Sequence, residues 1–149
     1  MLDTLRESLI EALYMLPAIV TALSFHEWAH AFISTKLGDP LPKATGRLTL
    51  NPAKHIDPIG FIMLFIVRFG WAKPVMVDPR FYKNKKLGMS LVAIAGPVSN
   101  LLLGFVSTIL WMAVVVIGAN SGSQSAVLEV IEKMCIYGMV INIGLAIFN

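Results

Sequence analysis

The sequence predicts an all-α, polytopic membrane protein with three transmembrane helices, a re-entrant or interfacial hairpin and a small β element. Three observations support this fold class. Hydrophobic residues make up 56% of the 149 residues and charged residues only 14%, whereas about a quarter of a soluble domain is charged. The mean hydropathy is +0.74. No Asp, Glu, Lys or Arg occurs from Leu87 to Leu128, a stretch far longer than the roughly 20 apolar residues that span a bilayer.

The whole chain, residues 1–149, is expected to form a single membrane-embedded domain. Its first transmembrane helix is expected at residues 8–35, because the apolar run Ala12–Ile33 is long enough to cross a bilayer. Pro17 is expected to kink this helix, a defect that membrane helices tolerate. Gly38 and the two prolines that follow it end the helix.

The loop at residues 43–80 is expected to contain two short strands, Gly46–Leu50 and Val75–Val77, bounded by turn residues. Between them, the apolar run Ile59–Trp71 is too short to cross a bilayer. This run is therefore expected to form a re-entrant or interfacial hairpin.

The second and third transmembrane helices are expected at residues 89–118 and 127–149. The chain ends at Asn149 without a polar flank, so the domain is expected to be incomplete at its C-terminal end. A single cysteine, Cys135, excludes an intrachain disulfide.

The net charge of +3 is modest, and the basic residues gather in two loops. This distribution indicates membrane topology rather than nucleic-acid binding. Because Ile59–Trp71 is not expected to cross, both loops lie on one side, which the positive-inside rule makes cytoplasmic. Their basic residues are Lys36, Lys43, Arg47 and Lys54 in the first loop, and Lys73, Arg80, Lys83, Lys85 and Lys86 in the second.

The first transmembrane helix contains the sequence HEWAH, in which His26, Glu27 and His30 are ionisable groups within an apolar run. Residues four apart share one face of a helix, so the two imidazoles can bind one metal ion. Glu27 lies beside them, where its carboxylate can take a proton from a metal-bound water. Ionisable groups are costly in a membrane and usually functional there. The spacing therefore predicts a zinc site with Glu27 as general base.

Four segments together resemble the site-2 proteases, a family of intramembrane zinc metalloproteases, and in particular its small bacterial and archaeal members. They are HEWAH at 26–30, NPAKHIDPIG at 51–60, GWAKPVMVDP at 70–79 and AGPVSN at 95–100. The closing NIGLAIFN also fits. The resemblance implies a three-helix core in which His26 and His30 bind Zn²⁺ and Glu27 is the catalytic base.

The resemblance also implies a third zinc ligand, an aspartate in an LDG-type motif that is expected beyond Asn149. The chain thus looks truncated before this motif. His55 and Asp57 are alternative ligands from the loop, although the neighbouring prolines favour a rigid turn there. The family further implies that Asn100 holds the substrate carbonyl near the zinc, and that His55 gates the site or contacts substrate. From the residues alone, Asn100 could equally serve helix packing, and His55 could order its loop.

The expected function is that of a zinc endopeptidase that cleaves transmembrane or juxtamembrane segments of other membrane proteins. Activity is expected of the complete protein rather than of the truncated chain. The two alternatives are an inactive membrane scaffold related to these proteases and a metal or proton transporter. The expected partners are a membrane-protein substrate and the lipid bilayer, with no nucleic acid. The expected location is the cell membrane, with the site near the cytoplasmic side and with strand edges that capture an unwound substrate.

Overall fold

The computed structural model describes residues 2–67, 70–121 and 125–148 of the chain. Its three long helices are α1 (Leu2–Lys36), α4 (Lys85–Ser121) and α5 (Ala126–Ile147). Each of them is long and apolar enough to cross a membrane. The three long apolar helices that the sequence predicts are therefore confirmed, and the all-α fold fits a polytopic membrane protein.

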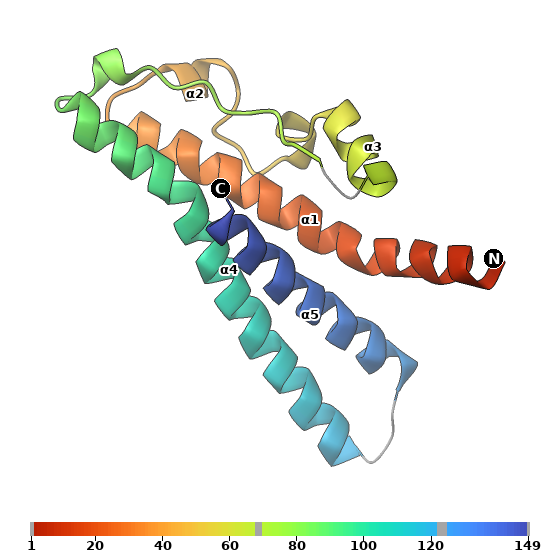
Figure 1. The fold of residues 1–149 in the computed structure, drawn as a ribbon. Coiled ribbons are helices and arrows are strands. Elements are labelled where there is room, and N and C mark those ends of the chain that lie inside the picture. Colours follow the sequence, from red (N-terminus) through yellow and green to blue (C-terminus); the bar gives the residue numbers. More distant parts are fainter. Residues whose placement is uncertain (1, 68–69, 122–124, 149) are drawn as a thin grey trace.

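The long helices pack as a three-helix unit in which α4 contacts both α1 and α5, and α5 also contacts α1. Figure 1 shows α4 and α5 as an antiparallel pair, with the N-terminal half of α1 diverging from them. The outward faces carry large apolar side chains, such as Leu102 and Phe105 on α4 and Val140 on α5, each more than 60% exposed. Such a surface suits the hydrocarbon of a bilayer.

Small residues bring α4 and α5 close together. A Cβ atom on Gly138 would lie 2.7 Å from Oγ of Ser107, and one on Gly104 would lie 3.6 Å from Cβ of Asn142. Asn142 is 2% exposed, and its Nδ2 donates to the backbone oxygen of Gly138 at 2.8 Å. Membrane helices associate through such close packing because lipid tails are as apolar as their side chains.

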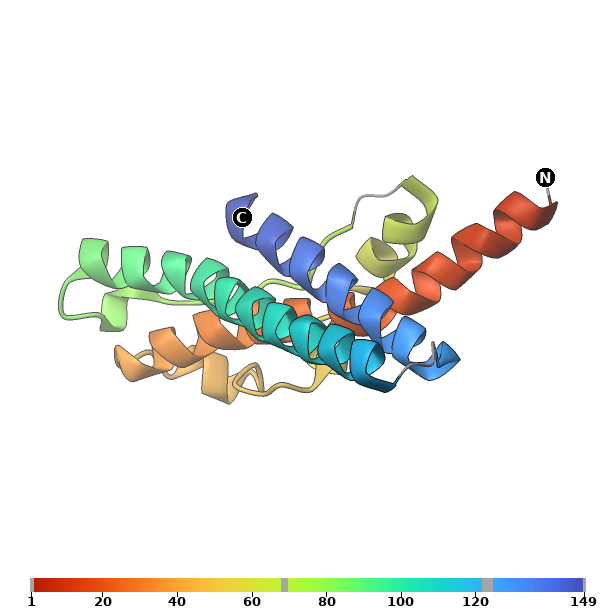
Figure 2. The same ribbon diagram turned by 90° about the horizontal axis from the view of Figure 1, so that it is seen from below.

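In the described part of the chain, four short helices follow α1 and precede α4 in the sequence. The longest of them, α3, has ten residues. A helix of that length rises about 15 Å, half of the hydrocarbon core, so α3 cannot span it. The first part of the expected hairpin is a helix beside α1 (Figures 1 and 2). A hairpin is not shown in the described residues, and Arg68 and residue 69 lie outside them. The four are α2 (Leu41–Ala44), η1 (Pro52–Lys54), α3 (Pro58–Val67) and η2 (Pro79–Phe81).

The two expected strands, Gly46–Leu50 and Val75–Val77, are not formed, and this part of the prediction is wrong. The described residues contain one isolated antiparallel bridge instead, between Ile56 and Ala72. The physical reason lies in the hydrogen-bond partners of the extended chain. The amide of Val75 donates to the side chain of Glu27 rather than to a neighbouring strand.

We expect Gly138→Ala to destabilise the α4–α5 pair by about 1–3 kcal/mol, because the added methyl group overpacks the contact with Ser107. Gly144→Ala is the matched control on the same helix, since a Cβ atom there meets nothing within 4 Å. The control should be neutral or stabilising, as alanine is the better helix former. Unfolding in mixed detergent micelles measures both variants, and equal stability of the two would contradict the packing argument.

Candidate functional site

His26 and His30 lie one turn apart on α1, and the helix brings their side chains together as the spacing predicts. Their ring centroids are 4.7 Å apart, and the ring planes meet at 83°. The side chain of His26 is buried, with 6% exposed. Both rings face α4, at a residue of that helix that has no side chain.

The glycine that makes room for the two rings is Gly96 of α4. A Cβ atom at this position would lie 2.5 Å from Nε2 of His30 and 2.6 Å from Nε2 of His26. The Nε2 atoms of both histidines therefore converge on one point beside the α4 backbone. This close approach explains why a glycine stands at position 96, four residues before Asn100.

His30 is oriented by a second contact with α4. Its Nδ1 lies 2.6 Å from the backbone oxygen of Val92. Because a carbonyl oxygen can only accept, Nδ1 carries the proton in the tautomer that this hydrogen bond assigns. The lone pair of the imidazole is then on Nε2, which faces Gly96. Histidines that bind metals are usually oriented in this way by a hydrogen bond from the other ring nitrogen.

Glu27 is held by a contact of its own, with the loop that follows α3. Its Oε2 accepts the backbone N–H of Val75 at 3.0 Å, and 8% of the residue is exposed. One carboxylate oxygen is thus held by the loop between α3 and η2. This contact with Val75 was not predicted, and nothing in the spacing of the sequence indicates it.

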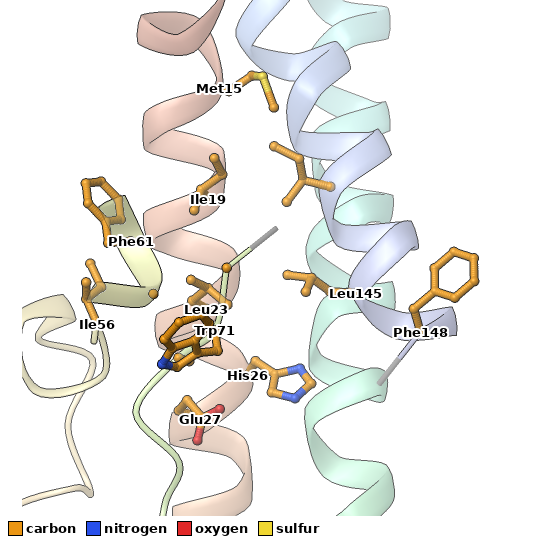
Figure 3. A pocket seen from close by; sticks show the side chains of 14 residues that line it. Met15, Ile19, Leu23, His26, Glu27, Ile56, Phe61, Trp71, Leu145 and Phe148 are labelled. Carbon is orange, nitrogen blue, oxygen red and sulfur yellow. The ribbon is translucent and has the colours of Figure 1, made fainter. Parts of the chain in front are cut away.

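Beside these residues lies a largely apolar cavity of about 320 Å³, shown in Figure 3. His26 and Glu27 lie on its wall, below Trp71 in this view. The other side chains come from three helices and the loop, so segments far apart in the sequence share one cavity. They include Met15, Ile19 and Leu23 of α1, Ile56 and Phe61 on the loop side, and Leu145 of α5 with Phe148.

Asn100 lies one turn beyond Gly96 on α4 and is completely buried. Its Oδ1 accepts a long hydrogen bond of 3.3 Å from the hydroxyl of Ser99. Its Nδ2 has no hydrogen-bond partner within the described part of the chain. A buried amide donor without a partner is costly, so this side chain has binding capacity left for another group.

His55 is also completely buried, but it lies apart from the histidine pair. Its Nε2 is 2.6 Å from the backbone oxygen of Thr49, so the ring ties its own loop together. Asp57, the other alternative ligand, accepts the N–H of Gly60 at 2.8 Å and caps the start of α3. Neither residue joins His26 and His30, and the described residues contain no group of three or more His, Cys, Asp or Glu side chains that could hold a metal ion.

Comparison with known proteins gives four significant matches. The chain is 48% identical to the protein named putative zinc metalloprotease YwhC of Bacillus subtilis over 93 residues, which are 62% of this chain and 42% of YwhC. It is 34% identical to putative zinc metalloprotease Rip2 of Mycolicibacterium smegmatis over 88 residues, 55% of this chain and 33% of that protein. It is also 36% identical to putative zinc metalloprotease Rip2 of Mycobacterium tuberculosis H37Rv over 90 residues, which are 56% of this chain and 34% of that protein.

These matches confirm the resemblance to the site-2 proteases. The matched region spans less than half the length of each of these relatives. No protein-family model matches the chain, and no solved structure matches it significantly. For a site-2 protease-type sequence, the pair His26 and His30 fits a zinc ion as two of its ligands, because both Nε2 atoms converge and Gly96 leaves room beside them.

We expect Gly96→Ala to weaken zinc binding by roughly 10-fold or more, since its methyl group would displace both imidazoles. Gly104→Ala is the matched control on the same face of α4, because its Cβ would meet its nearest neighbour at an ordinary 3.5 Å. Zinc per protein molecule, measured by mass spectrometry on the purified full-length protein, compares the two. Full zinc content in Gly96→Ala would show that zinc binding does not depend on the close approach of the two imidazoles to Gly96.

Proposed function

We propose that this chain forms the zinc-binding core of an intramembrane endopeptidase that cleaves a transmembrane or juxtamembrane segment of another membrane protein. The observation that carries the proposal is the convergence of two imidazole nitrogens beside Gly96, with Glu27 next to them on the wall of an apolar cavity. The names of the relatives support zinc and peptidase chemistry.

In this proposal His26 and His30 would hold the zinc through their Nε2 atoms. Catalytic zinc usually has three protein ligands and one open position. The resemblance to the site-2 proteases implies an aspartate of an LDG-type motif as the third ligand. Zinc, when bound, supplies a water whose pKa is lowered to about 7 and polarises the scissile carbonyl.

Glu27 acts as the proton carrier. Its Oε2 is held by the amide of Val75, which leaves Oε1 to take the proton from the attacking water. The same oxygen then delivers this proton to the nitrogen of the leaving amine. Holding one oxygen fixes the direction of the other, so the base meets the water in a single orientation.

The cavity and the buried amide of Asn100 would handle the substrate. The side chains that line the cavity, which include Leu23 and Phe61, suit the apolar side chains of a membrane segment. Nδ2 of Asn100 has the capacity to donate to a substrate carbonyl. His55 would contribute by keeping its loop in place through its hydrogen bond to Thr49, because the next residue, Ile56, lines the cavity.

The proposed location is the cell membrane, with the site toward the cytoplasmic side. Six of the nine basic residues of the two loops lie between α1 and α4, and Lys36, Lys85 and Lys86 lie at the adjoining helix ends. The helix α3 is too short to move the chain to the other side. The positive-inside rule then places both loops in the cytoplasm. The proposed re-entrant or interfacial element is α3, whose Ile59 and Ile66 are 65% and 69% exposed.

Glu27→Gln is the decisive substitution. The glutamine keeps an oxygen that can accept the N–H of Val75 but no longer takes a proton, so cleavage should fall by about 10²-fold or more while zinc is retained. His26→Ala and His30→Ala should lose the zinc itself. The full-length protein is assayed on a membrane-protein substrate, with zinc content measured in parallel. Normal cleavage by Glu27→Gln would reject the proposed mechanism.

The topology is tested by single cysteines at Lys43 and Lys83, two exposed positions on either side of α3. Both should react with a membrane-impermeant maleimide from the cytoplasmic face only, because α3 does not cross. The native Cys135 is buried and serves as the background control. Labelling of the two positions from opposite faces would mean that the chain crosses the membrane between them.

A further inference from the structure

The segment at residues 72–78 runs in an extended conformation from α3 toward η2 and is fastened to side chains outside it. The amide of Val75 donates to Oε2 of Glu27 at 3.0 Å. Three residues later, the amide of Asp78 donates to Oδ2 of Asp39 at 2.8 Å. One of these carboxylates is the proposed base, and the other has no part in the chemistry described above.

Asp39 is a buried carboxylate, 1% exposed, with a full set of donors. Besides the amide of Asp78, Oδ2 accepts the hydroxyl of Ser34 at 2.7 Å, and Oδ1 accepts the amide of Leu41 at 2.9 Å. The hydroxyl of Ser34 also lies 2.7 Å from that of Tyr82. Hydrogen bonds to a charged acceptor are stronger than neutral ones, so this carboxylate links the end of α1 to the segment and, through Ser34, to Tyr82 at the end of η2.

The chain places Asp39 rigidly. Gly38 has a φ of +106°, in the left-handed region that glycine adopts at the end of a helix. The turn lets the amide of Asp39 donate to the backbone oxygen of Ser34 at 3.1 Å. A side chain on Gly38 would also press against the backbone oxygen of Phe81 at 3.3 Å. Asp39 is therefore held as an extension of the helix that carries Glu27.

The side chain of Asp78 is engaged by Arg80. The guanidinium of Arg80 donates through Nε to both carboxylate oxygens at 2.9 Å, and these hydrogen bonds lower the pKa of Asp78. The contact between Asp78 and Asp39 uses only the backbone of Asp78, so its side chain can be removed without removing the donor.

We infer that Asp39 is a positioning residue for Glu27, which it serves by fixing the 72–78 segment so that the amide of Val75 meets the base. The inference rests on the proposed function for its catalytic consequence. An extended chain advances about 3.3 Å per residue, so Asp39 holds the segment roughly 10 Å from Val75. Pro74 and Pro79 flank this stretch and restrict its backbone, which transmits the position of one end to the other.

The test is hydrogen exchange of individual amides, read by mass spectrometry on the full-length protein in nanodiscs. In Asp39→Ala, the amides of Asp78 and Val75 should both exchange faster, although Val75 has no contact with the substituted side chain. Asn84→Ala is the matched control, because Oδ1 of Asn84 also accepts a backbone amide, that of Leu87 at 3.1 Å. This substitution should leave the exchange rate of the Val75 amide unchanged.

Kinetics give the second readout. Per zinc-loaded molecule, kcat of Asp39→Ala should fall roughly 10- to 100-fold, as for supporting residues around other metal sites, with little change in KM or zinc content. Asp78→Ala should keep most of kcat because the backbone donor remains. If Asp39→Ala fails to fold, Ser34→Ala replaces it. This variant keeps the carboxylate of Asp39 and removes one of its donors. It should speed the exchange of the Asp78 and Val75 amides as well, but by less than Asp39→Ala does.

Faster exchange confined to Asp78, or an unchanged kcat in zinc-loaded Asp39→Ala, would overturn the inference. The proposed function fails separately, if the parent protein does not cleave or if Glu27→Gln cleaves normally. The exchange of Val75 reports on positioning whether or not a substrate has been found.

Discussion

The site depends on the close approach of α1 and α4 at Gly96. Hydrocarbon offers no hydrophobic gain for bringing two membrane helices together, so contact at this depth requires small residues and polar partners. Gly96 supplies the space and the carbonyl of Val92 supplies the polar partner, one turn apart on α4. If α4 stood further away, the histidine rings would lose the surface that aligns them.

Much of the fold could be predicted from composition and spacing. The uncharged stretch from Leu87 to Leu128 required a long membrane helix, and the four-residue spacing of His26 and His30 placed both rings on one face. These inferences succeeded because each depends on the period of a single helix.

What could not be predicted depends on the register between elements. Nothing in the sequence states that Gly96 meets the two imidazoles or that the amide of Val75 meets Glu27. Val75–Val77 does have the composition of a strand and is extended, yet the amide of Val75 bonds to the carboxylate of Glu27, and that of the following Asp78 bonds to Asp39. Asp39 illustrates the same limit, since an aspartate after Gly38 resembles an ordinary turn residue until its donors are seen.

The hydrogen bond between His30 and Val92 has a consequence for the order of biogenesis. A lone α1 in the bilayer would leave the imidazole free to exchange its proton between the two nitrogens, with no partner to select one form. Only docking against α4 selects the tautomer whose Nε2 lone pair is directed at the space beside Gly96. Under the proposed function, pairing of α1 with α4 would thus orient His30 before a metal ion binds, because the hydrogen bond to Val92 exists without the ion.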